Sequence, residues 1–141
     1  MTDVDRRAYP LDNAEEVLLR QVHPHFLDAK GEVMRVAFAP AHPREEGLLS
    51  TRREEVGPEI AFAEWTGARG SGASVGTWGV SVGDAAGAEL PCFDDSHMPE
   101  YPAYHATVDF SDHEHARHKQ LSRKIWQAAV ARGCLFRPSD N

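Results

Sequence analysis

Alternating hydrophobic and polar positions predict several short strands. The clearest alternation is in 105–110 (HATVDF), where apolar side chains at even positions predict a buried face. The polar positions, expected to face outward, are His105, Thr107 and Asp109. Four further segments with branched or alternating side chains predict strands: 17–22, 32–38, 48–50 and 75–82.

Near the C-terminus the hydrophobic period becomes that of an amphipathic helix. The inward stripe consists of Leu121, Ile125, Ala128 and Arg132. Ser111 and Glu114 match a capping box, which predicts that this helix begins at Asp112, and Gly133 supplies its end. A second helix is expected over 58–65, because proline suits the first helical position.

The segments between these elements are rich in proline, glycine or charge. We expect 1–13 to be a flexible N-terminal arm, 67–72 (GARGSG) a loop and 83–102 irregular. Residues 14–141 are predicted to form a single α+β domain. Its sheet of short strands is expected to be mixed or antiparallel, with the long C-terminal helix packed across it.

Composition and charge exclude several classes of protein. The net charge of −7, with histidine neutral, argues against general nucleic-acid binding. No apolar run approaches the roughly 20 residues that span a bilayer, so no membrane segment is expected. The first ten residues lack the hydrophobic core of a secretory signal, and Cys92 and Cys134 match no disulfide or metal spacing. We therefore expect a cytoplasmic protein without a cofactor.

Segment 111–118 (SDHEHARH) almost matches the H-E-x-x-H helix of zinc proteases. His113 and His118 are five positions apart, which separates them by roughly 140° around a helix. The segment is therefore interpreted as a solvated first helical turn. His115 with His118, or Glu114 with His118, has a spacing that can share a metal, but each pair needs ligands from elsewhere.

The segment 23–25 (HPH) is the other metal candidate. On an extended strand His23 and His25 point to the same side, and His42 or His105 would complete a three-histidine site. The alternative is that Pro24 ends a strand and two polar residues flank the turn.

Four motifs in order resemble a group of small uncharacterised bacterial proteins. These motifs are LLRQVHP, GEVMRVAF, LLS and YHATVDF, and the resemblance runs from about residue 17 to residue 110. That group shares an Arg-x-[Val/Ile]-His-Pro start, a Leu-Ser pair and a late His-Ala strand. Met34 and Arg35 stand where its pattern has hydroxyl residues. The resemblance brings no known function.

The resemblance nominates Arg20, His23, Ser50 and His105 as catalytic residues. Arginine binds a phosphate or carboxylate through two parallel hydrogen bonds, and histidine transfers protons near neutral pH. A serine can position a substrate or attack it. In one regular strand Arg20 and His23 point to opposite faces, so a shared site requires a bend before Pro24.

Three functions from different classes remain open at this point. The first is a small bacterial interaction protein, of the immunity, antitoxin or accessory-subunit type, that works with a larger protein partner; its acidic charge would steer a basic partner. The second is a transferase or hydrolase that acts on a nucleotide or another phosphate-bearing small molecule. The common nucleotide-binding loop signatures are absent from the chain. The third is a metalloprotein built on His23 and His25.

Overall fold

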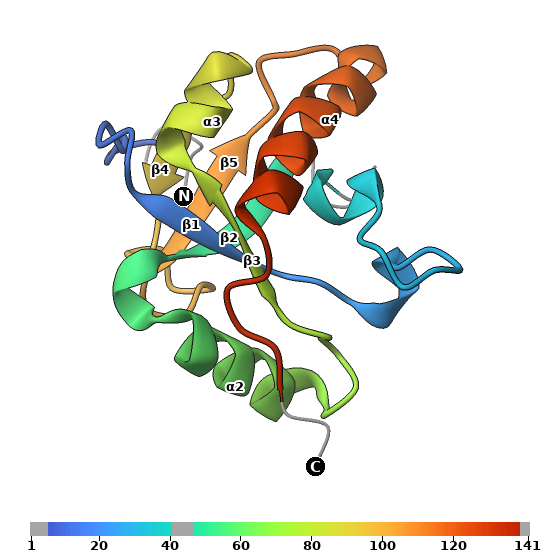
Figure 1. Ribbon diagram of the computed structural model, residues 1–141. Coiled ribbons are helices and arrows are strands. Elements are labelled where there is room, and N and C mark those ends of the chain that lie inside the picture. The colour runs from blue at the N-terminus through green and yellow to red at the C-terminus, as the bar shows by residue number, and fades with distance from the viewer. Residues whose placement is uncertain (1–5, 41–46, 139–141) are drawn as a thin grey trace.

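The computed structural model describes residues 6–40 and 47–138 and contains one five-stranded antiparallel sheet (Figure 1). The strand order is β3-β1-β2-β5-β4, and every neighbouring pair is antiparallel. The strands are β1 (Val17–Gln21), β2 (Leu48–Arg53), β3 (Thr77–Ser81), β4 (Cys92–Asp94) and β5 (His105–Asp109). The predicted single α+β domain is confirmed. Its sheet was expected to be mixed or antiparallel, and it is antiparallel.

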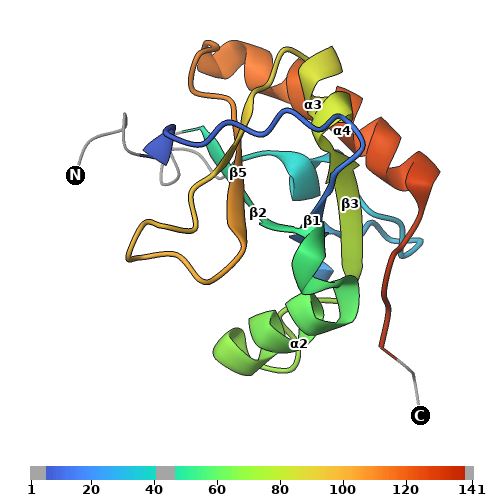
Figure 2. The same ribbon diagram turned by 90° about the vertical axis from the view of Figure 1, so that its left-hand side faces the viewer.

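Helices cover both faces of this sheet (Figures 1 and 2). The helices are α2 (Pro58–Arg69), α3 (Val82–Gly87) and α4 (His115–Arg132), with short 3-10 turns η1 (Pro24–Phe26), η2 (Arg35–Phe38) and η3 (Glu54–Val56). The main core lies between one sheet face and α3, α4 and η2, whereas α2 and η3 pack on the other face. None of the helices in the described part of the chain has the length and apolar character to cross a bilayer.

The C-terminal helix packs across the sheet as predicted. Leu121, Ile125 and Ala129 are buried in the core. Ala129 rather than Ala128 is the deeply buried alanine, and Arg132 ends the stripe by donating a hydrogen bond to the Gly79 carbonyl at 2.8 Å. Apolar burial on this helix is therefore the main attachment of α4 to the sheet.

The predicted start of α4 is wrong. The helix begins at His115, with Glu114 at the N-cap position and no side-chain capping bond. The Ser111 N–H donates to Asp109 Oδ1 at 2.7 Å, and the His113 N–H donates to the Phe110 carbonyl at 3.0 Å. These bonds form a turn after β5. The sequence pattern of a capping box is therefore present at Ser111 and Glu114, but the capping hydrogen bonds do not form.

The predicted strand 32–38 is also wrong, because most of this segment forms η2. Ala37 and Phe38 are buried in the main core beneath α4. The Trp126 side chain of α4 donates to the Val33 carbonyl at 2.9 Å. The segment therefore packs under a helix instead of adding to the sheet, although its side chains alternate.

The segment 83–102, expected to be irregular, contains α3 and β4. Ser81 and Asp84 form a reciprocal capping box, each side chain accepting the backbone N–H of the other at 2.9 Å. That cap stabilises a short helix, which the sequence analysis missed because the segment is rich in glycine and alanine. Helix α2 similarly runs past the expected 58–65 to Arg69, into the segment expected as a loop, and ends at Gly70.

The described part of the N-terminal segment, residues 6–13, bonds to the sheet. The Leu11 N–H donates to the Cys92 carbonyl, and the Asp94 N–H donates to the Tyr9 carbonyl, both at 2.9 Å. Arg6 is buried, with its Nη2 3.1 Å from an oxygen of Asp109. This segment therefore covers the outer edge of β4.

The two cysteines differ in their environment, which predicts different reactivity. Cys92 is buried in β4, and burial, together with nearby carboxylates, raises the pKa of its thiol to about 12. Cys134 is exposed. We expect a thiol reagent at neutral pH to modify Cys134 rapidly and Cys92 only after unfolding, because the thiolate is the reactive species. Mass spectrometry after timed labelling would measure this, and equal labelling rates would contradict it.

Candidate functional site

The polar face of β5 is buried rather than solvated. His105, Thr107 and Asp109 were expected to face outward, yet they are 4%, 1% and 0% exposed. They lie on the face opposite the main core, where Asp109 contacts the N-terminal segment and His105 contacts the connection 95–104. Figure 2 shows both of these segments running beside β5. The prediction of their orientation within the strand holds, but the prediction that water covers them is wrong.

A buried carboxylate organises this face. Asp95 is fully buried; its Oδ1 lies 2.6 Å from His105 Nδ1, and its Oδ2 accepts a hydrogen bond from Thr107 Oγ1 at 2.5 Å. The Tyr101 ring stacks on the His105 ring at 3.7 Å between centroids and 7° between planes. A carboxylate at this distance holds a proton on Nδ1, so the other ring nitrogen, Nε2, is the one left for a ligand or a proton.

Two side chains of β2 lie on the same face as this pair. In the sheet register Ser50 is opposite Thr107 and Arg52 is opposite His105. The Arg52 Nη2 donates to Glu64 at 2.8 Å, but its Nε is buried without an acceptor. Such a buried, unsatisfied donor costs about 1–3 kcal/mol. Of the four predicted residues, Ser50 and His105 therefore share one face.

Arg20 projects from the opposite face of the sheet, beside Trp78 on β3. Its Nε donates to the Ala37 carbonyl at 2.8 Å, and its Nη1 donates to the Ser50 carbonyl at 3.0 Å. These bonds fasten η2 to the sheet. The structure thus gives Arg20 a structural contact with the backbone of Ser50 but does not bring it to the Ser50 side chain.

His23 lies beyond the end of β1. Its Nδ1 accepts the backbone N–H of His25 at 3.0 Å and caps η1, and the two rings are 4.4 Å apart between centroids. His42 lies outside the described residues. Within 6–40 and 47–138, no three histidine, cysteine, aspartate or glutamate side chains gather as a metal site requires.

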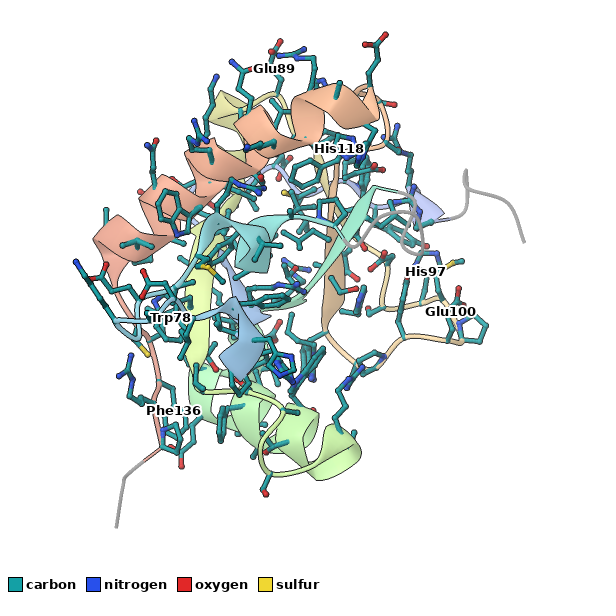
Figure 3. All side chains as sticks on the ribbon, turned by 90° about the vertical axis from the view of Figure 1, so that its right-hand side faces the viewer. Trp78, Glu89, His97, Glu100, His118 and Phe136 are labelled. Atoms are coloured by element: carbon teal, nitrogen blue, oxygen red, sulfur yellow. The ribbon has the colours of Figure 1, made fainter. Side chains whose placement is uncertain are left out.

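Two histidines, His113 before α4 and His118 within it, bond to backbone carbonyls. His113 Nε2 is 2.8 Å from the Glu89 carbonyl, and His118 Nε2 is 3.1 Å from the Phe110 carbonyl (Figure 3). The His115 and His118 rings meet edge-on at 5.4 Å. Each bond holds a proton on Nε2 and orients the ring against the backbone, which supports a structural role for these two side chains.

A cleft of about 550 Å³ lies where the N-terminal segment meets the ends of β1, β2 and β4. The described residues that line it are Tyr9, Pro10, Leu11, Asp12, Asn13, Glu16, Arg53, Asp94, Ser96 and His97. Three of them are carboxylates and one is an arginine, so the lining carries an excess of negative charge. Figure 3 shows His97 and Glu100 on the 95–104 connection, well away from Trp78 and Phe136.

Arg53 holds two of these carboxylates in place. Its Nε and Nη2 donate to both oxygens of Glu16 at 2.6 and 2.8 Å, and its Nη1 donates to Asp94 at 2.9 Å. Burial opposes ionisation of Asp94, but hydrogen bonds from Ser96 and Arg53 lower the pKa of its carboxyl below the ordinary value. At the mouth, Tyr9 is 58% exposed and meets the His97 ring edge-on at 5.0 Å. The cleft thus offers fixed negative charge beside an exposed aromatic ring.

The architecture defines an α+β domain with a buried Asp95–His105 pair and a separate acidic cleft. Comparison of the chain with protein-family models, with curated proteins and with solved structures found no match.

Two residues of the polar face, Arg52 and Asp95, were missed by the sequence analysis. Arg52 is two positions from Ser50 and so shares its face, which the alternation rule could have indicated. Asp95 lies in a segment that was expected to be irregular, and nothing in the local pattern links it to His105.

Proposed function

We propose that this chain is a small bacterial interaction protein, of the immunity, antitoxin or accessory-subunit type, that binds a larger protein partner in the cytoplasm. The acidic cleft beside Tyr9 is the observation that carries the proposal. Asp12, Glu16 and Asp94 outnumber Arg53 there, and the whole chain has a net charge of −7. This charge favours a basic segment of the partner and would accelerate its association.

The form of the cleft supports binding of a side chain rather than general electrostatic attraction. Arg53 fixes Glu16 and Asp94 before any partner arrives, so little conformational freedom is lost on binding. The exposed Tyr9 ring provides the face on which a guanidinium or ammonium group packs. A lysine or arginine of the partner therefore meets both charge and an aromatic surface.

Photo-crosslinking in the source cells tests this proposal. A benzophenone amino acid replaces Tyr9 in one variant and Val130 in a matched control, because Val130 is 46% exposed on α4. We expect one protein to be captured from position 9 and not from position 130, through a lysine- or arginine-rich segment that mass spectrometry identifies. Capture of the same proteins from both positions, or through an acidic segment, would refute the cleft as the contact surface.

A charge variant gives the quantitative test with the captured partner. Asp12→Asn removes a lining carboxylate other than the two that Arg53 holds, and Glu59→Gln on α2 is the control for net charge. We expect Asp12→Asn to slow association about two- to threefold at low salt and Glu59→Gln to change it less, since steering depends on local charge. Stopped-flow measurement of the association rate decides; equal rates for the two variants would contradict a role for the cleft.

A further inference from the structure

One buried polar atom on this sheet face, Arg52 Nε, has no hydrogen-bond partner among the described residues. Ser50 and His105 lie on the same face, and the bond from His105 to Asp95 uses its Nδ1 and not its Nε2. Polar atoms of a folded protein are normally paired when they are withdrawn from water. The unsatisfied Arg52 donor, beside two further polar side chains, therefore points to a ligand that supplies acceptors.

The sheet register brings these three side chains together. Arg52 is directly opposite His105, and such pairs have Cβ atoms about 4.5–5.5 Å apart. Ser50 is two residues from Arg52 on the same strand, roughly 6.6 Å along it. Ser50 is half-exposed, so solvent reaches the face on that side.

The edge of the Arg52 guanidinium formed by Nε and Nη2 is only half filled. Glu64 accepts from Nη2 alone, and the Glu64 side chain is 55% exposed. The adjacent Arg53 shows the complete arrangement, in which Nε and Nη2 donate to the two oxygens of Glu16. A ligand with two oxygens in one plane would fill the Arg52 edge in the same way.

The donors indicate the chemical class of this ligand. Arg52 contributes a permanent positive charge, Ser50 a hydroxyl, and His105 a second N–H whenever its ring is protonated, because Asp95 accepts the first. A tetrahedral anion has enough oxygens for all three. We propose that Ser50, Arg52 and His105 bind a phosphate group, displacing Glu64 from Arg52, and that Asp95 orients His105 for this contact.

Ser50, Arg52 and His105 are not among the residues that line the acidic cleft, and this site goes beyond the proposed interaction function. Its ligand is free phosphate or the phosphate group of a small phosphomonoester. Titration with inorganic phosphate and with phenyl phosphate distinguishes the two sources.

Nuclear magnetic resonance of the full chain tests the site directly, because the ring signals of His105 report on a ligand bound beside that side chain. We expect inorganic phosphate to shift these signals with a dissociation constant of roughly millimolar size, as a few charge-assisted hydrogen bonds allow. Tighter binding of phenyl phosphate would identify a phosphomonoester as the source, and equal binding would identify free phosphate. Either result supports the site, whereas no shift with either compound would overturn it.

Two variants with opposite expected effects separate this site from a structural role of Arg52. Arg52→Gln should weaken phosphate binding about tenfold or more, and Glu64→Gln should strengthen it severalfold by releasing Nη2. Arg35→Gln is the control, because Arg35 bonds to Ser122 of α4 on the other side of the sheet. Equal affinities for Arg52→Gln and Arg35→Gln, or weaker binding by Glu64→Gln, would overturn the proposal even if Arg52→Gln lowers the melting temperature.

Discussion

Replacement of Asp109 by asparagine is expected to destabilise the fold by about 3–5 kcal/mol, because it leaves buried arginine charge without its partner. Asp109 is fully buried, and its Oδ2 lies 3.1 Å from Arg6 Nη2 and 2.9 Å from Arg7 Nη2. The Arg6 side chain is only 8% exposed, so water cannot replace the lost carboxylate. Chemical denaturation followed by tryptophan fluorescence measures the free energy of unfolding.

Asp112→Asn is the matched control for this experiment. Asp112 also binds Arg7, at 3.1 Å, but its side chain is 60% exposed. An exposed ion pair contributes about 0–1 kcal/mol, so this variant should unfold close to the wild type. Similar losses for both variants would show that burial of Asp109 does not determine the effect.

The same carboxylate gives a pH dependence with a defined sign. Burial raises the pKa of Asp109, but hydrogen bonds from Ser111, the charge of Arg6 and a hydrogen bond from Arg7 outweigh it and lower the pKa below its ordinary value. The unfolded chain therefore binds this proton first as the pH falls. The stability from Asp109 is complete above about pH 5 and decreases below about pH 4, where unfolded aspartate protonates. When the pH falls from about 5 to below about 4, the free energy of unfolding should decrease more for the wild type than for Asp109→Asn.

The elements that the sequence predicted are those whose pattern and environment agree. In β1, β3 and β5 one face packs in the main core, so their apolar positions reflect the sheet directly. The segment 32–38 has similar alternation, yet it forms η2 because α4 and η1 satisfy its backbone instead of a neighbouring strand. Alternation records which side chains are buried, and a 3-10 turn under a helix buries them as well.

The candidate site was harder to predict because its contacts join distant parts of the chain. His105 and Ser50 were nominated, but the sequence could not show that β2 and β5 are neighbours with Arg52 opposite His105. Arg20 was nominated for the anion, and the register places it on the other face. Along β2, neighbouring residues point to opposite faces of the sheet, so that Arg52 points to the polar face and the next arginine, Arg53, does not. Arg52 is therefore the arginine beside His105.

Loss of the Asp95 carboxylate should have the second large effect, because one side chain satisfies two buried groups. Asp95→Ala removes the acceptors of His105 Nδ1 and Thr107 Oγ1 together. Each buried donor left without a partner costs about 1–3 kcal/mol, so we expect the two donors together to cost about 2–6 kcal/mol. For a domain of this size that corresponds to a fall in melting temperature of roughly 10 °C, which calorimetry would detect.

Replacing the two partners of Asp95 one at a time measures how much each contact contributes to the loss of stability. Thr107→Val keeps the volume of the side chain and removes one donor to Asp95, and His105→Phe keeps a ring against Tyr101 while removing the other. If Asp95 connects them, the loss in Asp95→Ala/Thr107→Val should be smaller than the sum of the single losses, because the threonine donor is unsatisfied only when Asp95 alone is absent. Strictly additive losses would mean that Asp95 and Thr107 do not interact, and additive losses in the corresponding Asp95→Ala/His105→Phe variant would refute the orienting role of Asp95 toward His105.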